Sequence, residues 1–234
     1  MILLQVILLT SLFQGTSFNQ DISNWDTSTV TNMLGMFGGT SFNQDISSWD
    51  VSNVTNFSGM FGSNSVFNQD LGGSWDTSSA IYMSEMFRDT IFNQDIGDWN
   101  VSNVEFFNLM FLSNSVFNQD LSSWDTGKGR NYGQMFKNCT SFNQSLSDWD
   151  ISSTASRFES GPIGNSMSNM LDDCGMSQSN YDLTLIGWES QLNVPTDVRL
   201  GALNLTYTLG GSAEAARTSL INVYGWEIVG DSGV

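Results

Sequence analysis

The chain has 234 residues, of which 7 are lysine or arginine, 24 are aspartate or glutamate and none is histidine, so its net charge is -17. This charge excludes nucleic acid and anionic membrane surfaces as expected partners, because both are bound through basic patches. Apolar residues make up 40% of the chain and aromatic residues 12%, which is enough material for a core and argues against disorder.

Residues 1–17 begin with an apolar run that lacks the basic start and the small-residue cleavage site of a secretory signal. The run is too short to span a bilayer, so no membrane insertion is expected. Val6, Leu9, Leu12 and Phe13 precede Val30, Met33, Met36 and Phe37 by 24 residues. We interpret residues 1–17 as a partial N-terminal coil, uncapped and suited to end-to-end self-association. Such an open end suggests a fragment of a longer protein, and a retained signal sequence is the alternative.

From residue 18 the chain repeats one motif, which first reads Phe-Asn-Gln-Asp-Ile-Ser-Asn-Trp-Asp. Six copies begin at Phe18, Phe42, Phe67, Phe92, Phe117 and Phe142, at intervals of 24, 25, 25, 25 and 25 residues. Such a period predicts a solenoid over residues 18–151, in which each coil buries its faces against neighbouring coils.

Each repeat divides into two halves. The apolar residues of the first half, such as Phe18, Ile22 and Trp25, predict a short strand that pairs in parallel with the next coil, about 5 Å away. The second half places Val30, Met33, Met36 and Phe37 on one face of two helical turns. The predicted fold class is therefore an α/β solenoid with one short strand and one short helix per repeat. The recurring Asn19–Gln20 pair predicts ladders of stacked amides with a structural role.

The repeat F-N-Q-D-I-S-x-W-D-T/V-S-x-V-x-x-M-x-x-M-F runs from about Val6 to Ile151. It resembles the repeat of the mycoplasma-type and BspA-like surface proteins, which are relatives of leucine-rich-repeat solenoids. The resemblance implies a right-handed leucine-rich-repeat-like coil, an extracellular or cell-surface location, and a role in adhesion or protein contact. It carries no catalytic residue. The sixth copy departs from the pattern, because Thr154 and Arg157 replace apolar residues.

The C-terminal third predicts a closure of the array. Residues 152–188 form a degenerate coil with an insertion, in which Tyr181 and Trp188 keep the interval of Phe142 and Trp149. Residues 189–234 form a cap with a strand over 198–207, a helix over 213–224 that Ser212 caps, and a strand over 226–229.

Cys139 and Cys174 occupy equivalent repeat positions, so we expect them on adjacent coils. That separation allows a disulfide in an oxidising compartment, and two buried free thiols are the alternative.

Acidic residues recur in columns, of which the first is Asp21, Asp45, Asp70, Asp95 and Asp120. Aligned carboxylates favour calcium as a bound ion, and hydrogen-bonded turn residues are the alternative. A separate column is β-branched and predicts an exposed binding strip if it faces outward, or ordinary packing if it does not. Its members are Thr27, Val51, Thr77, Val101, Thr126 and Ile151.

No histidine, nucleophile elbow, phosphate loop or metal-ligand motif is present, so we expect no enzymatic activity and no cofactor other than calcium. The leading hypothesis is an extracellular or surface-displayed solenoid that adheres to a protein or glycan through a regular face. The alternatives are a structural spacer or lattice component, an ice-binding or calcium-dependent surface module, and a carbohydrate-active enzyme that uses pairs of aspartates.

Overall fold

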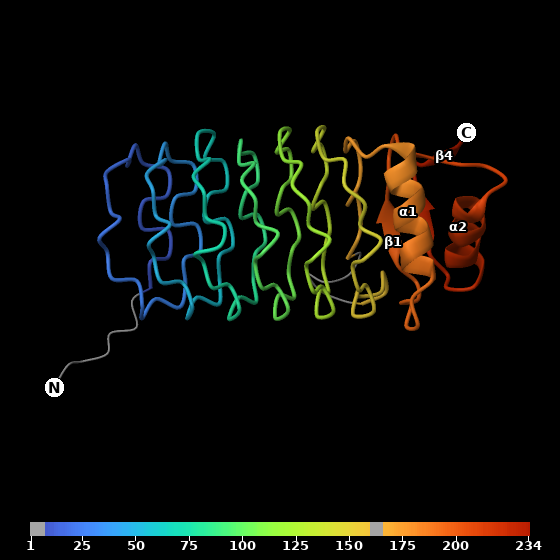
Figure 1. The fold of residues 1–234 in the computed structure, drawn as a ribbon, viewed down its shortest axis with the longest axis horizontal. Helices are drawn as coiled ribbons and strands as arrows, with labels where there is room; N and C mark the ends of the chain where they lie inside the picture. The colour runs from blue at the N-terminus through green and yellow to red at the C-terminus, as the bar shows by residue number, and fades with distance from the viewer. Residues whose placement is uncertain (1–7, 160–165) are drawn as a thin grey trace.

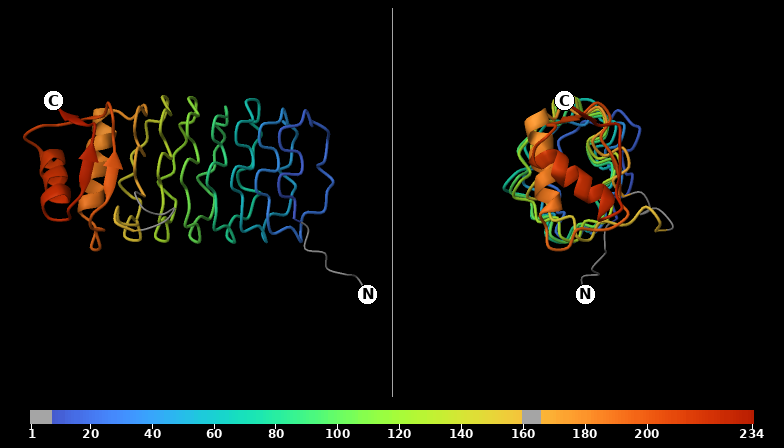
Figure 2. Two further views of the ribbon diagram at one scale, coloured as in Figure 1. Left: turned by 180° about the vertical axis from the view of Figure 1, so that it is seen from behind. Right: turned by 90° about the vertical axis from the view of Figure 1, so that its right-hand side faces the viewer.

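The structure, a computed structural model, describes residues 8–159 and 166–234. It is an elongated row of stacked coils, closed at its C-terminal end by two helices (Figure 1). Viewed along the row, the coils superpose on one outline (Figure 2). The apolar start of the predicted partial coil, residues 1–7, and part of the predicted insertion, residues 160–165, lie outside the described residues.

Neighbouring coils are joined by backbone hydrogen bonds in the second half of each repeat, whereas a strand was predicted in the first half. Met33 and Gly35, for example, donate their N–H groups to the carbonyls of Asn56 and Ser58 at 2.9 and 2.8 Å. The same segments carry isolated parallel bridges, which join Leu8 to Asn32, Asn32 to Asn56, Asn56 to Tyr82, Tyr82 to Phe106, and Phe106 to Asn131. The first half of each repeat consists of turns and extended segments without a bridge.

The helix predicted in the second half of each repeat is not formed, and both α-helices of the described residues lie in the C-terminal cap. Between the bonds to the next coil, Met36 donates back to Met33 and Gly38 donates back to Gly35, at 3.2 and 3.1 Å. Gly35 and Gly39 have φ values of +63° and +65°, in the left-handed region that an α-helix does not use. A series of tight turns therefore produces the apolar spacing that resembles a helical face.

The predicted core columns are confirmed by burial. In the inner coils the Phe, Ile or Leu, and Trp residues of the first half are buried, as are the Met-Phe pairs of the second half. Phe37 stacks on Phe42 within its coil at 3.9 Å between ring centroids and on Phe61 of the next coil at 5.8 Å. The indole N–H of Trp49 donates to the carbonyl of Ile22 at 3.1 Å, which satisfies a polar group inside an aromatic core.

The C-terminal cap, taken here as residues 178–234 and so wider than the predicted 189–234, contains six short elements. They are α1 (Gln178–Glu189), β1 (Arg199–Gly201), β2 (Thr206–Tyr207), α2 (Ser212–Asn222), β3 (Glu227–Val229) and β4 (Ser232–Gly233). β1 pairs in parallel with β3, and β2 pairs in parallel with β4. The strand predicted over 198–207 is thus two strands separated by a turn, and Gly211 rather than Ser212 is the N-cap of α2.

Helix α1 takes the place of the first half of a seventh coil. The indole of Trp188 donates to the carbonyl of Leu146 at 2.9 Å, just as the indole of Trp149 donates to Leu121 at 3.0 Å. Asn180 of α1 donates its side-chain amide to the carbonyl of Asn143 at 2.7 Å. The helix therefore packs on the last coil through the same polar contacts that another coil would make. Neither helix of the described chain is long and apolar enough to cross a membrane.

Candidate binding groove

The column of aspartates expected to bind calcium forms turns. The carboxylates of Asp21, Asp45 and Asp120 each accept the backbone N–H of the residue two positions ahead at 2.9 Å. Asp70 and Asp95 do the same with Gly72 and Gly97. The described ranges contain no group of three or more His, Cys, Asp or Glu side chains that is placed to hold a metal ion. This geometry matches the alternative role of hydrogen-bonded turn residues.

The serine amides also change the acidity of this column. The backbone N–H of Ser23 holds the pKa of Asp21 below its ordinary value, and that of Ser47 does so for Asp45. A hydrogen bond to the charged form stabilises the carboxylate. In Asp45 the neighbouring charge of Asp21 opposes this shift and has a smaller effect.

The β-branched column is buried, so the predicted exposed binding strip is wrong. Thr27, Thr77 and Thr126 are at most 2% exposed, and so are Val51, Val101 and Ile151. The threonine hydroxyls donate to carbonyls of the next coil, as Thr27 does to Asp50 at 2.9 Å. The physical reason is the turn that begins at the preceding residue: Asp26 accepts the backbone N–H of Ser28 at 3.1 Å, and the side chain of Thr27 between them points inward.

Both cysteines are free thiols, so the disulfide that their repeat positions allow is not formed. The thiol of Cys139 is buried and donates to the carbonyl of Phe111 at 2.7 Å. Burial raises the pKa of Cys139, and it raises the pKa of Cys174 to about 11. Both thiols are therefore protonated and unreactive at neutral pH.

The amide ladder predicted from the Asn-Gln pairs is confirmed. The side-chain oxygen of Asn43 accepts the backbone N–H of Asn68 at 3.1 Å and the side-chain amide of Gln69 at 3.1 Å. The next coils repeat this pattern, as between Asn93 and Asn118 at 2.9 Å. The side-chain oxygens of these asparagines therefore hold neighbouring coils together.

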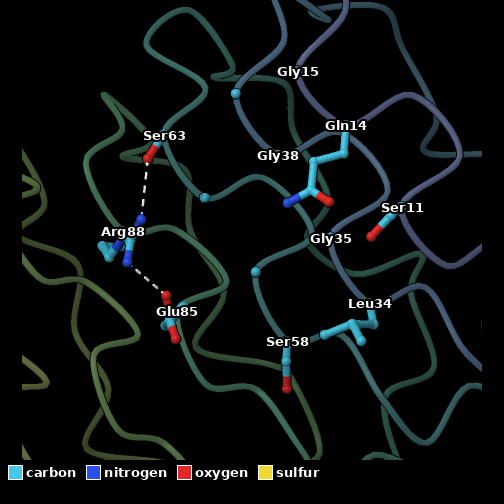
Figure 3. A pocket seen from close by; sticks show the side chains of 13 residues that line it. Ser11, Gln14, Gly15, Leu34, Gly35, Gly38, Ser58, Ser63, Glu85 and Arg88 are labelled. Atoms are coloured by element: carbon cyan, nitrogen blue, oxygen red, sulfur yellow. Dashed lines mark hydrogen bonds and ion pairs between the residues drawn. The ribbon is translucent and has the colours of Figure 1, made fainter.

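A groove of about 490 Å³ crosses the outer surface of the first coils (Figure 3). Its floor consists of backbone from two adjacent coils, at Gly35, Gly38, Gly39, Gly59 and Gly62. Leu34 and the hydroxyl-bearing Ser58 line it between the ends. Sequence reasoning missed this site, although the Gly38 position carries longer residues in other copies, namely Gln14, Arg88, Leu112 and Lys137.

The two ends of the groove are polar. Ser11 and Gln14 line the end nearer the N-terminus, and Glu85 and Arg88 line the other end (Figure 3). The guanidinium of Arg88 donates to Glu85 at 2.7 Å and to the hydroxyl of Ser63 at 3.4 Å. Its Nε atom also lies 3.3 Å from a carboxylate oxygen of Asp89. The groove thus holds both donors and acceptors, and the positive charge of Arg88 is outnumbered by the carboxylates of Glu85 and of Asp89 beside it.

A pair of aromatic rings joins the coil of Glu85 and Arg88, which carries Tyr82, to the next coil, which carries Phe106. Tyr82 is 41% exposed, and its ring lies 5.1 Å from that of Phe106, at an angle of 13°. The preceding coils carry Asn32 and Asn56 at this position. The side-chain oxygen of Asn56 accepts the N–H of Ser58 at 2.9 Å, so its amide is folded onto its own turn.

Near-identical coils stacked face to face, with a terminal cap and a grooved side, define a repeat protein. The family model described as "Mycoplasma protein of unknown function, DUF285" matches residues 3–90 and 71–173, and the chain belongs to this family. No curated protein and no solved structure matches the chain.

Proposed function

We propose that the chain is a non-enzymatic, cell-surface or extracellular repeat protein that binds a partner through the groove on its side. The proposal includes kinship with the BspA-like proteins and a leucine-rich-repeat-like class for the stacked coils. The observation that carries it is the local loss of side chains across neighbouring coils, between two polar ends, in an otherwise regular array.

The glycine at position 38 is not required by the backbone, which supports a binding role. The φ value of Gly38 lies outside the left-handed region, whereas those of Gly35 and Gly39 lie within it. A Cβ atom at Gly38 would meet its nearest atom at 3.4 Å, an ordinary contact. Since other coils place long side chains at this position, the open floor is a property of these coils rather than of the repeat.

The acidity of the aspartates supports a non-enzymatic role. General acid catalysis near neutral pH needs a carboxyl group whose pKa is raised. The turn hydrogen bonds of Asp26, Asp76 and Asp120 instead lower their pKa values.

The test is a screen of the purified chain against host-cell surfaces and glycan arrays, with a variant that fills the groove. Gly38→Arg introduces an arginine at a position where the chain carries Arg88 two repeats further on. The fold is therefore expected to tolerate it. We expect it to weaken binding at least tenfold, because the side chain occupies the floor.

Leu112→Arg is the matched control, since it adds the same charge at the equivalent position but outside the groove. Equal binding by wild type and Gly38→Arg would show that the groove is not the binding site.

A further inference from the structure

Tyr82 does not line the groove itself but lies on the same coil as Glu85 and Arg88, which do. Tyr82 is bridged to Asn56, two residues before the groove residue Ser58, and it stands three residues before Glu85. One face of the ring packs on Phe106. Within the described ranges no other ring stacks on Tyr82, and the coil before it offers only the folded amide of Asn56. Tyr82 is 41% exposed, so part of its ring remains accessible to a ligand.

The polar groups beside this ring suit hydroxyl groups. A hydroxyl both donates and accepts, so it can pair with the Arg88 guanidinium and the Glu85 carboxylate at once. These two groups already lie 2.7 Å apart, which matches adjacent hydroxyls on a sugar ring. The hydroxyls of Ser58 and Ser63 and the amide of Gln14 add further donors and acceptors.

The charge of the site disfavours an anion. Arg88 is paired with both Glu85 and Asp89, so this end of the groove carries more negative than positive charge. The whole chain has a net charge of -17, which repels sialylated or sulfated glycans. A neutral ligand avoids this penalty.

We infer that the groove and the Tyr82–Phe106 pair bind a neutral oligosaccharide, an inference that rests on the proposed function and names its ligand class. The apolar C–H face of one sugar ring packs on Tyr82, because the face of an aromatic ring is negative and aliphatic C–H groups are weakly positive. Its hydroxyls pair with Glu85 and Arg88. The groove spans three coil spacings, about 15 Å, which suits an oligosaccharide rather than a single sugar.

The test uses calorimetry and aromatic NMR shifts with lactose, N-acetyllactosamine, maltotriose and mannotriose, with sialyllactose and heparin as anionic probes. The variants are Tyr82→Asn, Phe106→Asn and the double variant. Asparagine occupies the equivalent position in other coils, as Asn32 and Asn56, so the turn is expected to form. We expect at least one neutral sugar to shift the Tyr82 resonances. Loss of the ring pair should weaken its binding about tenfold.

The control is Phe158→Asn, which removes an aromatic side chain that is 72% exposed and does not line the groove. Unchanged affinity in the double variant, stronger binding of the anionic probes, or no binding by any neutral sugar would overturn the inference. A purified protein partner could bind the wild-type chain without being displaced by any sugar. If Gly38→Arg then blocks its binding, the proposed function stands and the inferred oligosaccharide ligand is wrong. If Gly38→Arg blocks nothing, the proposed function fails as well.

Discussion

Single residues in this protein are constrained most strongly by backbone conformation. Two positions in each coil lie in the left-handed region, with φ between 53° and 65° in the second to sixth coils. The first column is Gly35, Gly59, Glu85, Leu109 and Gln134, and the second is Gly39, Ser63, Asp89, Ser113 and Asn138. Since an L-residue in this region is destabilised by about 1–2 kcal/mol, the copies without glycine carry strain that the stacking of coils must offset.

This constraint predicts different outcomes at two glycines of the same groove. Gly59→Ala is expected to lower the free energy of unfolding by about 1 kcal/mol, because φ is +59° although no atom lies within 4 Å of the new methyl group. Gly38→Ala, with an ordinary φ, is expected to be neutral or slightly stabilising. Urea unfolding monitored by tryptophan fluorescence measures both. A larger loss in Gly38→Ala than in Gly59→Ala would show that space, rather than φ, decides the effect, because only the methyl group at position 38 has neighbours within 4 Å.

Among the elements, the cap depends on one buried ion pair. Arg217 of α2 makes two hydrogen bonds of 2.7 Å to Asp231, whose side chain is 1% exposed. The hydroxyl of Tyr181 in α1 also donates to Asp231 at 3.0 Å. The hydrogen bond to Asp231 raises the pKa of Arg217, and burial raises the pKa of Tyr181. This cluster joins both helices to the segment before β4.

Arg217→Met is expected to destabilise the cap by about 3–5 kcal/mol, because it leaves the buried carboxylate of Asp231 without its cation. The helical circular dichroism signal reports on the cap, since both helices of the described chain lie there. Arg130→Met is the control, since it breaks an exposed pair with Glu159 and should change stability by less than about 1 kcal/mol. Losses of similar size in the two variants would contradict the importance of the buried pair.

At the scale of the whole molecule, repetition multiplies the effect of each turn. Hydrogen bonds from the serines two positions ahead lower the pKa of five aspartates, namely Asp21, Asp26, Asp45, Asp76 and Asp120. A group whose pKa is lower in the folded state stabilises the fold above its unfolded pKa. That contribution is lost as the pH falls through the folded pKa.

We therefore expect the melting temperature to be highest between about pH 5 and 8 and to fall below about pH 4. Protonation also relieves the repulsion of a chain with a net charge of -17, and it acts in the opposite direction. Thermal unfolding from pH 7 to pH 3 measures the balance. A melting temperature that rises below pH 4 would show that repulsion is the larger effect.

Asp76→Asn provides the matched variant for this titration. Asparagine preserves the turn, as Asn100 shows by accepting the N–H of Ser102 at 3.1 Å, but it does not ionise. The variant should lose less stability than wild type between pH 5 and pH 3.

The sequence by itself determined the period, the buried Phe, Ile or Leu, and Trp columns, and the amide ladder. It did so because a repeat places equivalent residues in equivalent environments. Identical side chains in successive repeats are therefore expected to be buried or hydrogen-bonded in the same way. Asn43 and Asn68 were predictable in this way without coordinates.

Only the tertiary structure decided which half of the repeat pairs with its neighbour, since a series of tight turns and a helix bury Met33, Met36 and Phe37 with the same spacing. It also decided that Thr27 points inward, and that helix α1 replaces half a coil while keeping the contacts of Trp188. The groove depends on adjacency between coils, because side chains that are missing from two neighbouring repeats form a hollow only when the coils stack. The sequence pattern shows which residues are buried. The direction in which a side chain points and the presence of a groove depend on contacts between segments that are distant in the chain.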